Sequence, residues 1–131
     1  MPKAVLAGGS GYLGSCVSSQ LAALGWEVAI LSRRPSGHGE IEWDGKTPGP
    51  WQGSLEGAQA VFNFSGASIA RKFTPANKKL LRDSRVHPTL ALARAVAACE
   101  TPPPVWVNCC AAGIYGDRGE ETLIEGSPPG A

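Results

Sequence analysis

The 131-residue sequence has no excess of charge of either sign and no long hydrophobic run. Twelve Lys and Arg residues nearly balance eleven Asp and Glu residues, so the formal net charge at pH 7 is +1. This balance argues against nucleic acid as a partner. The longest apolar stretches have the length of strands, which argues against a membrane span. The N-terminal residues MPKAVLAGG lack the layout of a signal peptide, so we expect a cytoplasmic protein.

Cysteine and histidine are scarce, and their spacing argues against a metal site. The four cysteines are Cys16, Cys99, Cys109 and Cys110, none of them in a Cys-x-x-Cys pair, and the two histidines lie far apart. Zinc sites need several such ligands at short spacings. We therefore expect no metal and four reduced, buried thiols, as is usual for a cytosolic protein.

The sequence also lacks internal repeats and low-complexity segments, and short apolar segments alternate with helical ones. Strands are predicted over residues 3–9, 26–34, 41–44, 60–67 and 105–113, and helices over 12–25 and 75–98. Residues 45–57 are predicted to form a loop with a short helical turn. The alternation predicts an α/β fold, with a parallel sheet of about five strands between helices on both faces. Ligands of such sheets bind at the carboxyl ends of the strands.

Apolar spacing predicts which helical residues face the core. The predicted core residues are Leu13, Val17, Leu21 and Leu24 in the first helix, and Leu80, Leu81, Leu90, Ala93, Val96 and Ala97 in the second. Pro88 lies inside the second helix, so we expect a kink or break near residues 86–87.

A glycine-rich segment joins the first predicted strand to the first predicted helix. Gly9, Gly11 and Gly14 have the spacing of the Rossmann G-x-G-x-x-G fingerprint, and Gly8, Gly11 and Gly14 have the spacing of extended short-chain dehydrogenases. Such glycines allow a tight turn, a close approach to a pyrophosphate and close helix–sheet packing. The pyrophosphate would lie on free N–H groups at the helix N-terminus. The predicted dinucleotide contacts here are Gly8, Ser10, Gly11, Tyr12, Leu13 and Gly14, and a purely structural glycine turn is the alternative.

The end of the second predicted strand indicates which dinucleotide is preferred. An acidic residue there would bind the ribose 2′-hydroxyl of NAD, but this chain has Ser32, Arg33 and Arg34. One hydroxyl and two guanidinium groups suit a phosphate dianion. We therefore predict that NADP(H) is preferred, with NAD(H) as the second cofactor. The alternative is that the two arginines are only solvated.

Several segments, in order, resemble the atypical extended short-chain dehydrogenases, in particular the NAD-dependent epimerase/dehydratase-like group with its sugar-nucleotide-epimerase-like proteins. The matching segments are VLAGGSGYLGS, VAILSRRP, IEWDG, VFNFSGASIA, LRDSRV and GIYGDRGEETLIEGSPPG. The resemblance covers nearly the whole chain. It implies a Rossmann-like three-layer α/β/α fold, here ending after about five strands.

The resemblance also implies further cofactor contacts. The turn after the fourth predicted strand, with Phe64, Ser65 and Gly66, would pass the adenosine ribose and the pyrophosphate, and Arg85 would reach the cofactor. The alternative for Arg85 is an exposed helical arginine. The dipeptide at 43–44 would either edge the adenine pocket or pack in the core. Lys78, Lys79 and Arg82 have the character of solvated charges.

The fifth predicted strand leads into the segment where the resemblance implies a catalytic rim. Cys110 stands where such enzymes have a serine, and Ile114 stands where the first tyrosine of their motif lies, whereas Tyr115 matches the second. Cys110 and Tyr115 are therefore the catalytic candidates. A thiol is a poor hydrogen-bond donor, and the alternative for Cys110 is a small, half-buried thiol. The Tyr-x-x-x-Lys pair of these enzymes would fall just beyond Ala131.

We therefore interpret residues 1–131 as one NAD(P)-binding Rossmann domain, the N-terminal part of a longer reductase- or epimerase-like protein. The expected partners are the dinucleotide and an unknown small-molecule substrate. For the isolated chain we expect cofactor binding without turnover. The alternative function is a non-catalytic dinucleotide-binding module or a redox sensor. A sheet that ends here leaves an edge uncovered, which predicts self-association.

Overall fold

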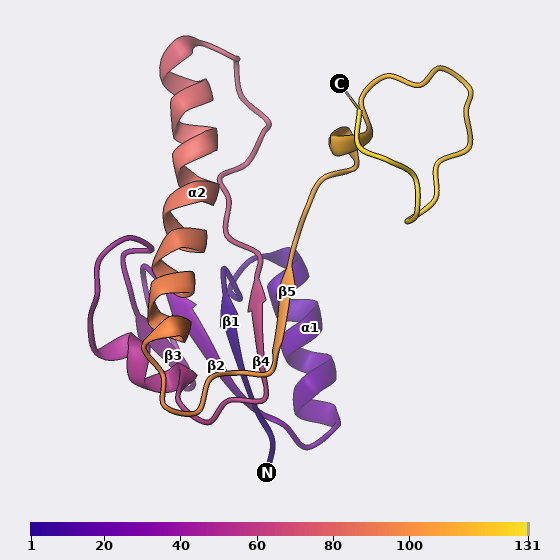
Figure 1. Cartoon of the computed structure of the whole chain (residues 1–131). Coiled ribbons are helices and arrows are strands. Elements are labelled where there is room, and N and C mark those ends of the chain that lie inside the picture. The colour runs from indigo at the N-terminus through magenta and orange to yellow at the C-terminus, as the bar shows by residue number, and fades with distance from the viewer. Residues whose placement is uncertain (131) are drawn as a thin grey trace.

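The computed structural model describes residues 1–130, in which five parallel strands form one sheet in the order β3-β2-β1-β4-β5 (Figure 1). The strands are β1 (Lys3–Ala7), β2 (Glu27–Ser32), β3 (Glu40–Glu42), β4 (Ala60–Asn63) and β5 (Val105–Asn108). Because every strand points the same way, all their carboxyl ends lie at one edge of the sheet. This confirms the predicted Rossmann-like α/β fold.

Helices lie on both faces of the sheet. Helix α1 (Tyr12–Ala23) covers one face, and α2 (Pro75–Ala97) covers the other together with the 3-10 helix η1 (Pro50–Leu55) (Figure 1). A second 3-10 helix, η2 (Ala112–Tyr115), follows β5. The helical turn expected within residues 45–57 is thus confirmed as η1.

The strands are shorter than predicted, mainly at their carboxyl ends. Strand β1 ends at Ala7 because Gly8 has a left-handed backbone (φ 70°) that turns the chain out of the ladder. Strands β4 and β5 both end at their paired asparagines, Asn63 and Asn108. Beyond these residues no neighbouring strand continues the pairing, although the sequence stays apolar.

Helix α2 packs on the sheet through its second half only. Its buried residues are Pro88, Ala91, Leu92 and Ala95, which contact the core around Val5, Val61 and Leu55. The helix runs continuously through Pro88, so a break at residues 86–87 is excluded, and Pro88 itself is buried in this packing.

The predicted core positions in the helices were partly wrong. Exposed residues among them are Leu13, Leu24, Leu80, Leu90, Ala93 and Ala97. The first turns of α2 extend past the carboxyl edge of the sheet, so Leu80 has no strand to cover (Figure 1). The other exposed positions lie away from the sheet. In their place the structure buries Trp43 and Trp51, which meet edge to face with ring centroids 5.1 Å apart.

A buried polar network ties α2 to the ends of two strands. The Asn63 side chain is 4% exposed. Its Nδ2 donates to Thr89 Oγ1 at 3.0 Å and to Asn108 Oδ1 at 2.8 Å, and its Oδ1 accepts from the Ser65 backbone N–H at 3.1 Å. The network fixes β4, β5 and α2 relative to one another at the carboxyl edge.

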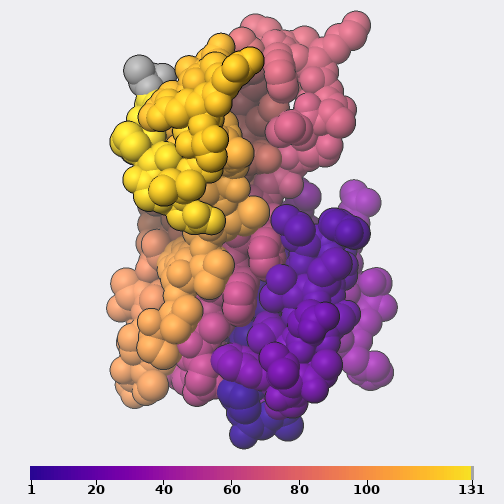
Figure 2. Space-filling model, turned by 90° about the vertical axis from the view of Figure 1, so that its right-hand side faces the viewer, coloured from indigo at the N-terminus to yellow at the C-terminus, as the bar shows by residue number. Residues whose placement is uncertain are grey.

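The last segment of the chain leaves the sheet. Residues 112–130 form a small lobe beyond the carboxyl end of β5 (Figures 1 and 2), closed by a hydrogen bond from Gly130 N to Ile114 O at 2.8 Å. Strand β5 is the sheet edge, with Val105 and Val107 exposed. Self-association through this edge stays a prediction, which a monomer in light scattering at high micromolar concentration would contradict.

The expectation of buried thiols was wrong for three of the four cysteines. Cys16, Cys109 and Cys110 are exposed, and Cys99 is half-buried. Cys16 lies on the outer side of α1, and Cys109 and Cys110 follow β5, where no further element covers the chain. Burial raises the pKa of the Cys99 thiol.

In residues 1–130 neither long helix combines the length and the apolar character needed to cross a bilayer.

The Leu92→Ala variant should lose about 2–5 kcal/mol of unfolding free energy, because the leucine is fully buried and the change leaves a cavity. Leu90→Ala on the same helix is the matched control, since Leu90 is 46% exposed and its loss should stay within about 0.5 kcal/mol. Urea unfolding monitored by circular dichroism measures both. Equal losses would contradict the packing of α2 described above.

Candidate functional site

The glycine loop between β1 and α1 has no room for a side chain at Gly8 or Gly14. A β-carbon on Gly8 would lie 2.8 Å from the Phe64 backbone carbon, and one on Gly14 would lie 2.4 Å from Gly9 Cα. Gly11 precedes α1 and offers no side-chain cap, so the first N–H groups of the helix have no capping partner. The loop is therefore an uncapped helix N-terminus packed tightly against the turn after β4.

A cavity of about 660 Å³ opens at the carboxyl edge of the sheet. Its walls come from the glycine loop, the ends of β2 and β3, the turn after β4 and the first turns of α2. The lining residues are Gly8, Ser10, Gly11, Leu31, Arg33, Trp43, Asp44, Gly45, Lys46, Phe64, Ser65, Gly66, Ala76, Lys79, Leu80, Asp83, Ser84, His87 and Pro88. Its volume lies in the range of small-molecule and cofactor sites.

One buried side-chain oxygen in the cavity lining has no hydrogen-bond partner. The Ser65 Oγ is buried and makes no hydrogen bond, although the Ser65 backbone N–H donates to Asn63 Oδ1. An unpaired buried hydroxyl is costly, and such groups usually have a partner. Because Ser65 lines the cavity, a polar group of a ligand bound there would supply the missing hydrogen bond.

A second hollow adjoins the first and is lined by Ser10, Ser32, Arg33 and Arg34. The Ser32 side chain is nearly buried, and its Oγ accepts a hydrogen bond from the Arg34 backbone N–H at 3.2 Å. Both arginines are exposed, and within residues 1–130 neither forms an ion pair with a carboxylate. The hollow thus offers a hydroxyl and two guanidinium groups to an anion.

The turn after β3 forms another wall of the cavity. The Asp44 carboxylate accepts hydrogen bonds from the Thr47 hydroxyl at 2.5 Å and from the backbone N–H groups of Thr47 and Lys46 at 2.7 and 2.8 Å. These bonds, the Thr47 hydroxyl first, lower the pKa of Asp44 to about 2. Trp43 packs on Trp51, and Trp43 and Asp44 also border the cavity, so the core packing is confirmed while an adenine contact stays a prediction.

The wall from α2 was missed by sequence reasoning. Ala76, Leu80 and Ser84 line the cavity at intervals of four residues, as do Lys79, Asp83 and His87. Lys79 forms an ion pair with Asp83, and the hydrogen bond from its ammonium group is the main cause of a lowered Asp83 pKa. The four-residue spacing was the available signal, but it shows only a shared helix face and not what that face meets.

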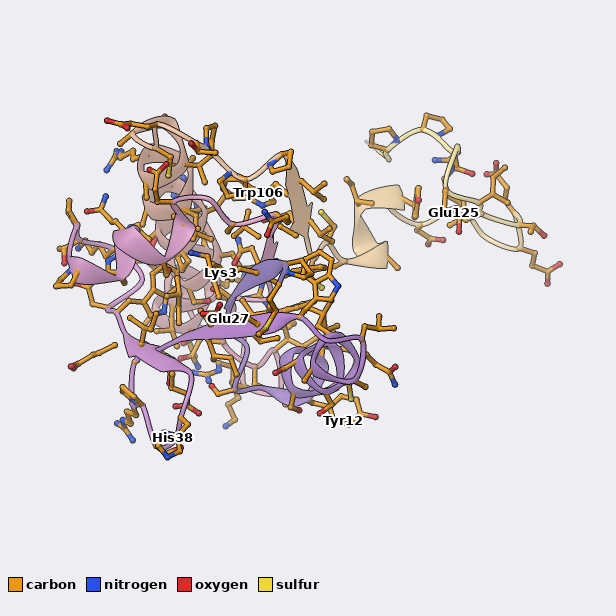
Figure 3. All side chains as sticks on the ribbon, turned by 90° about the horizontal axis from the view of Figure 1, so that it is seen from below. Lys3, Tyr12, Glu27, His38, Trp106 and Glu125 are labelled. Atoms are coloured by element: carbon orange, nitrogen blue, oxygen red, sulfur yellow. The ribbon has the colours of Figure 1, made fainter. Side chains whose placement is uncertain are left out.

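Four predicted cofactor contacts line neither the cavity nor the adjoining hollow. The side chains of Tyr12 and Leu13 are exposed on the first turn of α1 (Tyr12 is labelled in Figure 3). Gly14 is buried beneath the loop. The Arg85 guanidinium donates to Ala67 O at 3.2 Å and to Leu81 O at 3.0 Å.

The two catalytic candidates lie on the far side of β4 from the ends of β2 and β3. Cys110 is exposed just after β5, and Tyr115 is half-buried in η2, at the start of the lobe that also holds Glu125 (Figure 3). Neither lines the cavity. Their catalytic roles stay predictions.

The Thr47→Val variant should raise the pKa of Asp44 from about 2 toward 3.8, because it removes the hydroxyl that contributes most to the shift. A lowered folded-state pKa stabilises the turn above about pH 4, and this contribution is lost as the pH falls toward 2. NMR titration of the carboxyl carbon measures the midpoint. Thr122→Val in the lobe is the control, and an unchanged Asp44 midpoint in Thr47→Val would contradict the assignment.

Curated relatives match nearly the whole chain. An epimerase family protein of Bos taurus, SDR39U1, is 32% identical over 98% of this chain, and the Mycobacterium bovis epimerase family protein Mb2239 is 33% identical over 95%. The chain covers only 43% and 42% of the lengths of these two proteins. It therefore spans less than half of the relatives that it matches.

Solved structures show the same similarity. Human SDR39U1, determined with NADPH, matches with a TM-score of 0.80 and 28% identity over 97% of this chain and 42% of its own. A nucleoside-diphosphate sugar epimerase from Corynebacterium glutamicum matches with a TM-score of 0.79 and 33% identity over 100% of this chain and 27% of its own. The NAD dependent epimerase/dehydratase family matches residues 4–130, and the chain belongs to this family.

Proposed function

We propose that this chain is the NADP(H)-binding domain of an epimerase- or reductase-like short-chain dehydrogenase. The observation that carries the proposal is the hollow of Ser10, Ser32, Arg33 and Arg34 beside the glycine loop. It brings phosphate-binding groups to the strand end where dinucleotide folds hold the adenosine ribose. The NADPH in the similar human protein supports the same cofactor.

The residues present fit the shape and charge of such a cofactor. The uncapped N–H groups of α1 would hold the pyrophosphate, with Gly8 and Gly11 lining the cavity and Gly14 packing the helix closely against the loop. Ser32, Arg33 and Arg34 would hold a ribose 2′-phosphate. The turn with Phe64, Ser65 and Gly66 would contact the ribose, and the unpartnered Ser65 hydroxyl would gain a hydrogen bond.

When bound, the dinucleotide would supply hydride transfer, and the residues of the chain would hold and orient it. Cys110 and Tyr115 are the proposed catalytic positions. A thiol donates only a weak hydrogen bond, which favours the second candidate function, a dinucleotide-binding module without catalysis. Oxidation of NADPH by the isolated chain would contradict that second function.

A thermal-shift titration with NADPH and NADH tests the proposal directly. Binding to the folded chain should stabilise it by about 2.7 kcal/mol at a ligand concentration one hundred times Kd, which raises Tm by several degrees. NADPH should reach this shift at a lower concentration than NADH. If neither cofactor raises Tm, the proposed function is wrong.

The Arg33→Ala variant should weaken NADPH binding by roughly tenfold or more and change NADH binding little, because a guanidinium–phosphate hydrogen bond is charge-assisted. Arg94→Ala, in the last turn of α2 and outside the cavity lining, is the control. Isothermal titration calorimetry gives both dissociation constants. Equal losses for the two cofactors would contradict a role of Arg33 at the 2′-phosphate.

A further inference from the structure

We infer that Ser84 and Arg85 are positioning residues that hold the loop after β4 in its ligand-binding conformation. The inference rests on the proposed function, because the loop concerned forms one wall of the proposed cofactor site. It gives Arg85 a role through the loop backbone, in addition to the direct contact predicted from the sequence.

Both backbone polar groups of Ala67 are bound by neighbouring residues of α2. The Ala67 N–H donates to Ser84 Oγ at 2.9 Å, and the Ala67 carbonyl accepts from Arg85 Nη2 at 3.2 Å. Ala67 follows Ser65 and Gly66 directly, and these two residues line the cavity. Holding Ala67 therefore fixes the path of the residues that face the ligand.

The side chains of Ser84 and Arg85 both donate to the same carbonyl oxygen of the helix, that of Leu81. The Ser84 hydroxyl donates to Leu81 O at 2.9 Å, and Arg85 Nη1 donates to the same oxygen at 3.0 Å. The hydroxyl hydrogen of Ser84 is thus used in the bond to Leu81 O, and the Ser84 oxygen accepts the hydrogen bond from the Ala67 N–H. Both side chains reach the loop in a defined orientation.

Close packing supports the same role for Arg85. A β-carbon on Gly66 would lie 2.9 Å from Arg85 Cζ, so the guanidinium lies directly against the loop backbone. Within residues 1–130 Arg85 forms no ion pair, and it is absent from the cavity lining. Its hydrogen bonds go to backbone carbonyls and to the neighbouring Ser84 hydroxyl.

The loop has few other attachments near the cavity. Phe64 N donates to Ala7 O at 2.8 Å, where the loop begins, and Asn77 Nδ2 donates to Lys72 O at 2.8 Å, where it ends. Between these points only the bonds to Ala67 join the loop to α2 across the described residues. Loss of either bond should therefore loosen Gly66 and Ala67, while Ser65 stays bound to Asn63 Oδ1 through its backbone N–H.

The experiment compares Ser84→Ala and Arg85→Ala with wild type and with Arg82→Ala, an exposed arginine on the same helix. NMR hydrogen exchange of the Ala67 amide, measured without cofactor, reports on the loop itself. Calorimetric titration with NADPH reports on binding. We expect both test variants to speed Ala67 exchange and to weaken NADPH binding by between about 2-fold and about 10-fold, the range for one hydrogen bond. Arg82→Ala should change neither.

The outcomes separate positioning from direct contact. Weaker NADPH binding with unchanged Ala67 exchange would mean that Arg85 acts on the cofactor alone. Faster Ala67 exchange with unchanged NADPH binding would mean that binding does not require the loop to be held. Either result overturns the inference. If the wild type binds NADPH and both variants match it in Ala67 exchange and in NADPH binding, the inference is wrong and the proposed function stands. If the wild-type chain does not bind NADPH, the proposed function fails and the inference fails with it.

Discussion

The close approach of two backbones, at Gly8 and at Phe64, is the constraint on which the site depends. A β-carbon on Gly8 would meet the Phe64 carbonyl carbon, its oxygen and the Ser65 nitrogen, all within 2.9 Å. The left-handed turn at Gly8 starts α1 directly beside the turn after β4. The parallel pairing of β1 with β4 brings these two turns to the same edge. The uncapped end of α1 and the unpartnered Ser65 hydroxyl consequently face the same cavity.

Some charged groups around this cavity are already bound within the chain, whereas others are free to bind a ligand. Both carboxylates that line it are already bound, Asp44 by its own turn and Asp83 by Lys79. Within the described chain Arg33 has no such partner. Positive and negative residues of the lining are nearly equal in number, but the groups that remain free to bind a ligand are cationic. The site therefore favours an anionic ligand, which is the chemistry of a dinucleotide phosphate.

The sequence was informative where one short segment sets its own geometry. The Gly8–Gly14 loop and the parallel α/β order follow from local spacing, and both were predicted. The core face of α2 was not predicted, because Leu80 and Leu90 are as apolar as Leu92 and only the position of the sheet distinguishes them. The α2 wall of the cavity was missed for the same reason. Likewise, the hydrogen bonds of Arg85 depend on where a loop 18 residues away folds back.

Helix α2 serves two purposes because it is longer than the sheet that it covers (Figure 1). From Pro88 onward, Ala91, Leu92 and Ala95 are buried against the strands and anchor the helix. Before Pro88, the helix extends beyond the carboxyl edge, and Ser84 and Arg85 hold the loop while Asp83 and His87 border the cavity. Because the half from Pro88 onward packs on the strands and Asn63 Nδ2 donates to Thr89, the position of the half before Pro88 is set as well. The stability of the core and the shape of the site are thereby linked through a single helix.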